Sequence, residues 1–164
     1  MTVLSDIVDP TTCKVRFYVA DSDVATAQDV VNLRTELEWA TARWAKATKC
    51  DIAVGAPGEG IAVQLVAAVY DAEGNEHPGW CGPDESGQTV VQVTAGRSFA
   101  VLPHEMGHAL SKRHGHIEAG RPKNQQLCLM ETNGGQGIIT ADDLEWVCTN
   151  LNCQGMDPEE IVAP

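Results

Sequence analysis

The stretch "LPHEMGHALSKRH", residues 102–114, carries the chemistry expected of this chain and locates one of its helices. His104 and His108 are four residues apart, so a helix presents both imidazoles on one face, one turn apart, where both can reach a single metal ion. Glu105 lies about 100° further around the same helix and can reach a water molecule at that ion. This HExxH arrangement predicts two metal ligands and a general base.

A third ligand has to come from outside a continuing helix. His114 follows His108 by six residues, and an unbroken helix would carry it about 9 Å further along the axis and turn it away from the pair. We therefore expect the helix to end just beyond Leu110 and the chain to bend back towards the pair.

The spacing leaves other third ligands open. A bend at Gly115 would bring His116 to the pair in place of His114, and a later segment would supply Glu118 or Glu131.

The segment "HEMGHALSKRH" resembles the signature HExxHxxGxxH of the metzincin zinc peptidases, with Ser111 in the place of the glycine. The resemblance implies that Ser111 takes the left-handed conformation at the bend, which costs a non-glycine residue about 1 kcal/mol or more. The resemblance implies a Zn²⁺ ion held by three histidines, His104, His108 and His114. It favours His114 over His116, because a third histidine six residues after the second is the spacing that this class of site uses. It also implies that Glu105 is the catalytic base.

Metzincins carry a methionine in a tight turn beneath the metal, downstream of the third histidine. The segment "CLMETN", 128–133, places Met130 in a turn-prone context, and the resemblance implies that Met130 is that residue. The implied function is a zinc-dependent endopeptidase in which a metal-activated water attacks the peptide bond. The alternative is a metal-binding module of the same fold without significant proteolysis.

The resemblance also implies how a protein or peptide substrate would bind. An extended substrate would lie along an edge of the sheet formed near residues 74–82. The loop 128–139 would form the wall of the pocket beyond the scissile bond.

Hydrophobic patterning predicts the elements around this motif. Strands are expected at 13–20, 50–56, 61–70 and 89–96, and the near-continuous apolar run 61–70 is typical of a strand buried on both faces. Together with the helices, this predicts an α+β, metzincin-like zincin with a twisted, mixed sheet of four or five strands. A single domain, 1–164, is expected, with its core at about 13–152 and short terminal tails.

Three helices are expected: a long one, an active-site helix and a C-terminal one. The long helix occupies most of 21–49, and Asp21, Ser22 or Asp23 is expected to cap it. Its apolar stripe is expected to contain Val24, Ala27, Val31, Leu37, Ala40 and Trp44. The active-site helix follows Ser98. The C-terminal helix begins at Thr140, which forms a capping-box pattern with Asp143.

Six cysteines in a small acidic chain favour disulfides and an oxidising, extracellular compartment. Cys13 and Cys50 each precede a predicted strand, and would be close if those strands are parallel neighbours. Cys128 is expected to pair with Cys148 or Cys153.

A net charge of −12 disfavours nucleic acid and anionic membranes as partners. The sequence contains no run of 18 apolar residues, so we expect no membrane span. The N-terminus lacks the basic and apolar segments of a signal peptide. From the cysteines and the resemblance we nevertheless expect a secreted monomer that acts on proteins or peptides.

Overall fold

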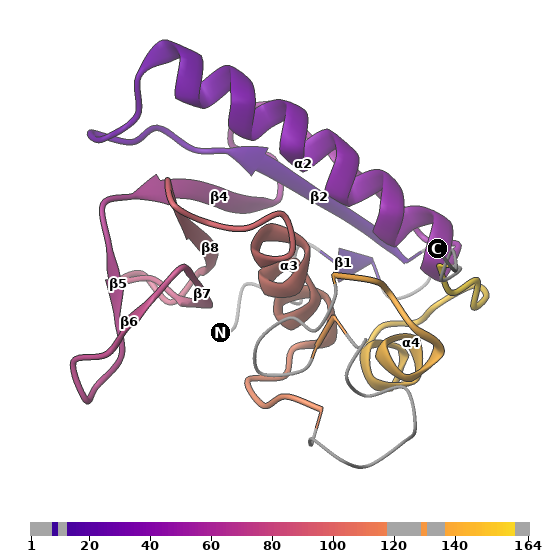
Figure 1. Cartoon of the computed structure of the whole chain (residues 1–164). Helices are drawn as coiled ribbons and strands as arrows, with labels where there is room; N and C mark the ends of the chain where they lie inside the picture. The colour runs from indigo at the N-terminus through magenta and orange to yellow at the C-terminus, as the bar shows by residue number, and fades with distance from the viewer. Residues whose placement is uncertain (1–7, 10–12, 118–128, 131–136, 160–164) are drawn as a thin grey trace, which may run out of the picture.

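The structure, a computed structural model, describes residues 8–9, 13–117, 129–130 and 137–159. In this part of the chain it forms one mixed sheet, a small hairpin and three helices (Figure 1), which confirms the α+β class. The sheet follows the order β1 (Val8–Asp9), β2 (Lys14–Val19), β4 (Ile61–Val66), β8 (Thr89–Thr94) and β7 (Gly79–Pro83), and β3 (Asp51–Val54) also pairs with β2.

The central strands are parallel and the end strands are antiparallel. Strand β2 pairs in parallel with β3 and with β4, and β4 pairs in parallel with β8. Strand β7 runs antiparallel to β8 and forms an edge of the sheet, as expected near residues 74–82. A separate hairpin, β5 (Val69–Tyr70) and β6 (Glu76–His77), leaves the sheet between β4 and β7.

One face of the sheet is fully covered. Residues that share this face by register are almost inaccessible to solvent, and they include Phe17, Ile61, Val63, Val91 and Val93. The prediction that 61–70 is buried on both faces is therefore wrong. Alternate residues of β4 are only half-buried, because both large helices pack on the same side of the sheet.

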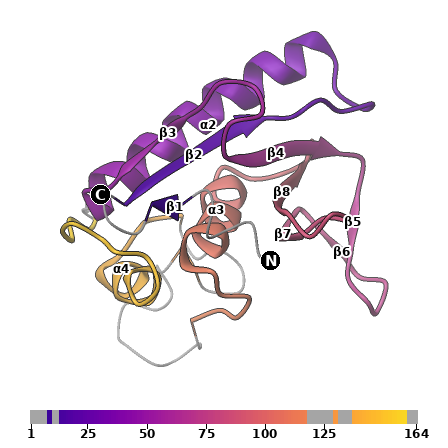
Figure 2. The same ribbon diagram turned by 180° about the vertical axis from the view of Figure 1, so that it is seen from behind.

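Helix α2 (Ala27–Thr48) runs alongside β2 in both views (Figures 1 and 2). It begins later than expected, because Thr26 and Asp29 form a complete capping box. The N-cap is therefore Thr26, and the predicted cap at residues 21–23 is wrong. Leu37, Ala40 and Trp44 are buried as predicted.

The first turns of α2 do not join the core. Val24 precedes the helix, and Val24 and Val31 are 49% and 57% exposed, against the predicted stripe. Burial on α2 begins at Leu33, where the helix starts to lie over other described elements.

Helix α3 (Val101–Ser111) carries the histidine motif, and α4 (Ala141–Cys148) is the C-terminal helix. Thr140 and Asp143 form the predicted capping box at the start of α4. In both views α3 lies between the β5–β6 hairpin on one side and α4 on the other (Figures 1 and 2). This order places the motif in the middle of the molecule, where side chains from both sides can meet it.

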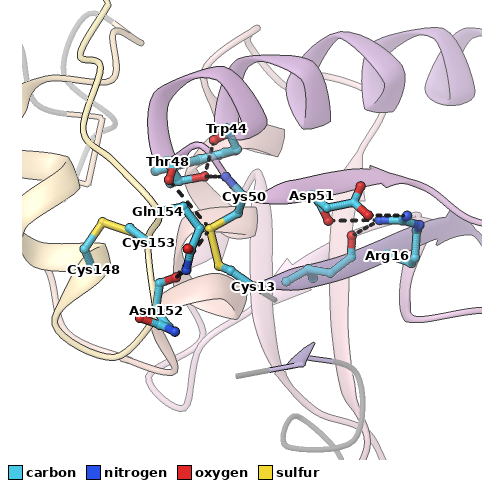
Figure 3. The surroundings of a disulfide bond; sticks show 11 residues. Cys13, Arg16, Trp44, Thr48, Cys50, Asp51, Cys148, Asn152, Cys153 and Gln154 are labelled. Carbon is cyan, nitrogen blue, oxygen red and sulfur yellow. Dashed lines mark hydrogen bonds and ion pairs between the residues drawn. A yellow bond between two sulfur atoms is a disulfide. The ribbon is translucent and has the colours of Figure 1, made fainter. Parts of the chain in front are cut away.

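Two disulfides close the end of the molecule near the C-terminus of α2 (Figure 3). Cys13–Cys50 is confirmed: β2 and β3 are parallel neighbours, and the Asp51 amide donates to the Cys13 carbonyl at 3.0 Å. The predicted pairing of Cys128 with Cys148 or Cys153 is wrong, because those two bond to each other across a separation of five residues.

Cys81 is the free cysteine of the described residues, and Cys128 lies outside them. Two disulfides favour an oxidising environment for this chain. No helix in the described ranges combines the length and the apolar composition that a bilayer crossing requires.

The segment after α4 is not a free tail up to residue 159. The Gln154 and Asp157 amides donate to carbonyls of the last turn of α2 at 3.0 and 2.8 Å. The Arg43 guanidinium of α2 pairs with both carboxylate oxygens of Glu159. These contacts hold α4 against the rest of the fold.

Candidate metal centre

Helix α3 presents His104 and His108 from a buried position. Pro103 lies in the first turn, where a missing amide proton is tolerated, and its carbonyl accepts a hydrogen bond of 3.0 Å from the Trp44 indole of α2. Both imidazoles are 8% exposed. The motif therefore sits on a helix held firmly against the core.

The Nδ1 atoms of both rings are hydrogen-bonded to backbone carbonyls. His104 Nδ1 lies 2.6 Å from the Leu129 carbonyl, and His108 Nδ1 lies 2.7 Å from the Arg113 carbonyl. A carbonyl only accepts hydrogen bonds, so each Nδ1 carries the proton. In the neutral rings both Nε2 atoms are then acceptors.

The two Nε2 atoms face each other at 3.1 Å. Two acceptor lone pairs at this distance have no proton to share. Burial lowers the pKa of both histidines to about 4, which keeps the rings neutral near pH 7. A cation bound between them would satisfy both lone pairs, and two nitrogens at about 2.05 Å on a tetrahedral zinc would be about 3.3 Å apart.

The helix ends one residue later than expected. Ser111 remains helical, and Lys112 takes the left-handed conformation with φ of 58°. The Ser111 hydroxyl instead lies 3.3 Å from the Arg113 amide and accepts its proton at the turn. The bend that the sequence predicts is present, and the residue that makes it is Lys112.

The third histidine beside the pair is His116. His104, His108 and His116 form a group whose ligand atoms all lie within 4.8 Å of one another. The His116 ring centroid lies 5.2 Å from that of His104 and 4.9 Å from that of His108. Among the described residues His114 is not part of this group, so the geometry favours the alternative, His116, over the histidine that the signature spacing selected.

His114 nevertheless lines the same cavity, and a charge on it would lower the pKa of His108. The other alternative ligands, Glu118 and Glu131, lie outside the described residues.

Glu105 sits beside the histidines as an unusual buried carboxylate. It is 7% exposed, and its Oε2 has no hydrogen-bond partner within the described residues. Burial raises its pKa to about 7, so the group exchanges a proton near neutral pH. A carboxylate in this state can accept a proton from a nearby water and return it.

Strand β7 approaches α3 closely at this point. A Cβ atom at Gly79 would lie 2.7 Å from Val101 and 3.1 Å from the Cγ of Glu105. Cys81, two residues along the strand, lies near enough to Glu105 that the carboxylate contributes to raising the pKa of the thiol, although burial is the larger cause. The edge strand thus runs directly past the carboxylate.

Met130 lies against the inner side of α3. A Cβ at Gly107 would overlap the Met130 sulfur and approach Trp44 to 3.1 Å. Met130 is fully buried and lies in a turn with Leu129. The predicted methionine is therefore packed beneath the helix residues between the two histidines; most of the loop 128–139 lies outside the described residues.

A buried carboxylate of α4 builds this turn. Asp143 accepts hydrogen bonds of 2.9 and 2.8 Å from the Leu129 and Met130 amides. The Leu129 carbonyl in turn orients His104. The sequence marks Asp143 only as a helix-capping residue, and no local signal shows that it also reaches a segment 13 or 14 residues upstream.

A cavity of about 720 Å³ opens onto these groups between α3, β7 and the β5–β6 hairpin. The three histidines of the group and Glu105 line one side. The hairpin side carries Tyr70 and Asp71, and β7 contributes Trp80. A ligand of peptide size would therefore contact the histidines, the carboxylate and the edge strand together.

In comparisons with known proteins, no protein-family model matches the chain and no curated protein sequence matches it significantly. The structure establishes a group of three histidines that can hold a metal ion, with a buried carboxylate beside it.

Proposed function

We propose that the chain is a zinc-dependent endopeptidase of metzincin type, in which three histidines hold the metal: His104, His108 and His116. The observation that carries this proposal is that two proton-free Nε2 atoms lie 3.1 Å apart in the same cavity as the buried Glu105, whose Oε2 has no partner among the described residues. His116 follows His108 by eight residues, two more than in the metzincin signature, and the bend at Lys112 comes one residue later than the signature implies.

Zinc suits this set of ligands. Three neutral imidazoles are the ligands of a catalytic site that keeps one position open, whereas structural zinc sites fill all four positions with protein groups. A zinc ion there would supply a Lewis acid that lowers the pKa of water towards 7.

Glu105 has the properties of the base. It is buried in the cavity beside the histidines and its Oε2 has no hydrogen-bond partner among the described residues, so it would be free to take a proton from the attacking water and deliver one to the leaving amine. A site that only bound metal would gain nothing from a buried carboxylate whose Oε2 has no partner among the described residues. This feature favours the peptidase over a metal-binding module of the same fold.

The substrate is a protein or peptide bound in extended form. β7 is the edge strand next to Glu105, and its free edge offers backbone hydrogen bonds to such a chain. The two disulfides suit secretion, where such substrates are met.

The deciding experiment combines metal analysis with cleavage of an unbiased peptide library. Glu105→Gln is expected to retain one zinc per chain and to lose at least about 100-fold in kcat, the usual contribution of a general base. Glu145→Gln, an exposed glutamate of α4, is the matched control and is expected to behave as the parent. A Glu105→Gln variant that cleaves the library as fast as the parent would refute the peptidase, and a parent without bound zinc would refute the metal site.

A further inference from the structure

Arg113 joins the segment after α3 to helix α4 through both its backbone and its side chain. Its guanidinium lies over the Trp146 ring, 4.5 Å from the centroid, and Nη1 donates to the Trp146 carbonyl at 3.2 Å. Its carbonyl, on the other side, accepts the Nδ1 proton of His108 at 2.7 Å. One residue thus connects α4 to a metal ligand.

The same tryptophan touches that ligand directly. The ring centroids of His108 and Trp146 are 5.9 Å apart in an edge-to-face arrangement. Trp146 is 8% exposed, so the ring is a fixed part of the core. The His108 ring is therefore bounded by the Arg113 carbonyl at one nitrogen and by the Trp146 ring at its side.

Arg113 also lies at the start of the segment that leads from α3 to His116. It follows Lys112, the left-handed residue that ends α3, and its amide is held by the Ser111 hydroxyl at 3.3 Å. Asn150, in the turn after α4, donates to the Ser111 carbonyl at 2.7 Å. The start of the segment to His116 is consequently held at two residues, Ser111 and Arg113.

We propose that Arg113 is a positioning residue of the metal centre: clamped on Trp146, it fixes the carbonyl that orients His108 and the starting point of the segment that delivers His116. The inference rests on the metal binding in the proposed function and not on peptide cleavage. Groups that orient a ligand imidazole typically contribute 10- to 100-fold to metal affinity. Arg113 itself touches neither metal nor substrate.

The test measures the zinc affinity of the full chain by chelator competition and the visible absorption of the cobalt(II)-substituted protein. Arg113→Ala is expected to bind zinc about 10- to 100-fold more weakly and to change the cobalt absorption bands, which report the ligand geometry. Arg113→Lys keeps the charge but not the planar stacking or the fork of donors, so it should restore affinity only in part.

Arg34→Ala is the matched control. Arg34 is an exposed arginine of α2 with its own ion pair to Glu38, and its removal should leave both readouts unchanged. The thermal unfolding of each metal-free variant separates loss of fold from loss of positioning, and should show a folded Arg113→Ala chain. If Arg113→Ala does not fold, Arg113→Lys decides by the same two readouts.

Zinc affinity within twofold of the parent and an unchanged cobalt spectrum in a folded Arg113 variant would overturn the positioning role alone. A parent that binds neither ion would overturn the metal centre and this role with it. A parent that binds zinc but cleaves no peptide would overturn only the peptidase.

Discussion

Gly107 and Met130 are in contact across the interface between α3 and the turn beneath it, so closely that a side chain at position 107 has no room. Gly107 lies between His104 and His108 in the helix, so Met130 packs against the helix segment that carries both histidines. The contact explains why a glycine, normally unfavourable inside a helix, stands at this position.

Gly107→Ala is therefore expected to destabilise the protein, although the same change raises helix propensity. The added methyl would overlap the Met130 sulfur and crowd Trp44 at 3.1 Å, and overpacking of this kind costs about 1–3 kcal/mol. Thermal or urea unfolding measures the change. Gly115→Ala is the control, because apart from its chain neighbours no atom of the described residues lies within 4 Å of a Cβ there. An unaltered or raised stability of Gly107→Ala would contradict the packing described.

Replacement of His114 and of His116 should have different effects on bound metal. His116→Ala removes a member of the histidine group and should lose stoichiometric zinc, whereas His114→Ala should keep it. Metal analysis of the purified variants gives the answer. The reverse pattern would return the third ligand to the spacing of the metzincin signature.

Glu105→Gln should change the pH dependence of stability in the metal-free protein. The pKa of Glu105 rises from 4.5 to about 7 on folding, so the folded parent binds the extra proton and loses stability as pH rises from about 4.5 to 7. Glutamine carries no such charge. At pH 8 the free energy of unfolding of the variant should exceed that of the parent by up to about 3 kcal/mol, because a tenfold change in proton affinity corresponds to about 1.4 kcal/mol.

Below about pH 4 this advantage of Glu105→Gln should vanish, because the parent carboxyl is then protonated in both the folded and the unfolded state. Urea unfolding of both chains at pH 8, 6 and 4 in the presence of a chelator follows the trend. A difference that does not vary with pH would show that burial does not raise the pKa of this carboxyl.

The two disulfides should contribute unequally to stability. Cys13–Cys50 closes 37 residues and Cys148–Cys153 only five, and the entropy of loop closure gives about 4 and about 2 kcal/mol for loops of these lengths. Paired alanine substitutions at each bridge, compared by urea unfolding, test the order. A larger loss from the short bridge would indicate that local structure in the unfolded chain outweighs loop entropy.

The cavity should favour cationic over anionic side chains in a substrate. Its described lining contains the carboxylates Asp71 and Glu105 and neither lysine nor arginine. A hydrogen bond from His77 and two from backbone amides hold the pKa of Asp71 at about 2, so this group stays charged. Peptides with lysine should be cleaved faster than matched peptides with glutamate, and high salt or Asp71→Asn should reduce the ratio; equal rates at low salt would contradict this.

Local patterns determined much of the framework. Two short apolar runs predict the strands that follow Cys13 and Cys50, whereas the parallel pairing of these strands, on which the Cys13–Cys50 bond depends, was left open by the sequence and is shown by the structure. The box of Thr140 and Asp143 marks the start of α4, and the four-residue spacing of His104 and His108 brings their rings together. Each of these local patterns depends on neighbours in sequence, which composition and periodicity encode directly.

Only the tertiary structure decided the remaining points. Ser111 and Lys112 can each adopt the left-handed turn at similar cost, so the sequence does not distinguish a helix end that delivers His114 from one that delivers His116. The contact of Arg113 with Trp146 holds the later bend in place. The link from Asp143 to Met130 and the closure of Cys148 on Cys153 depend likewise on where the chain returns in space. Long-range packing selected among local conformations of nearly equal free energy, and no local pattern records that choice.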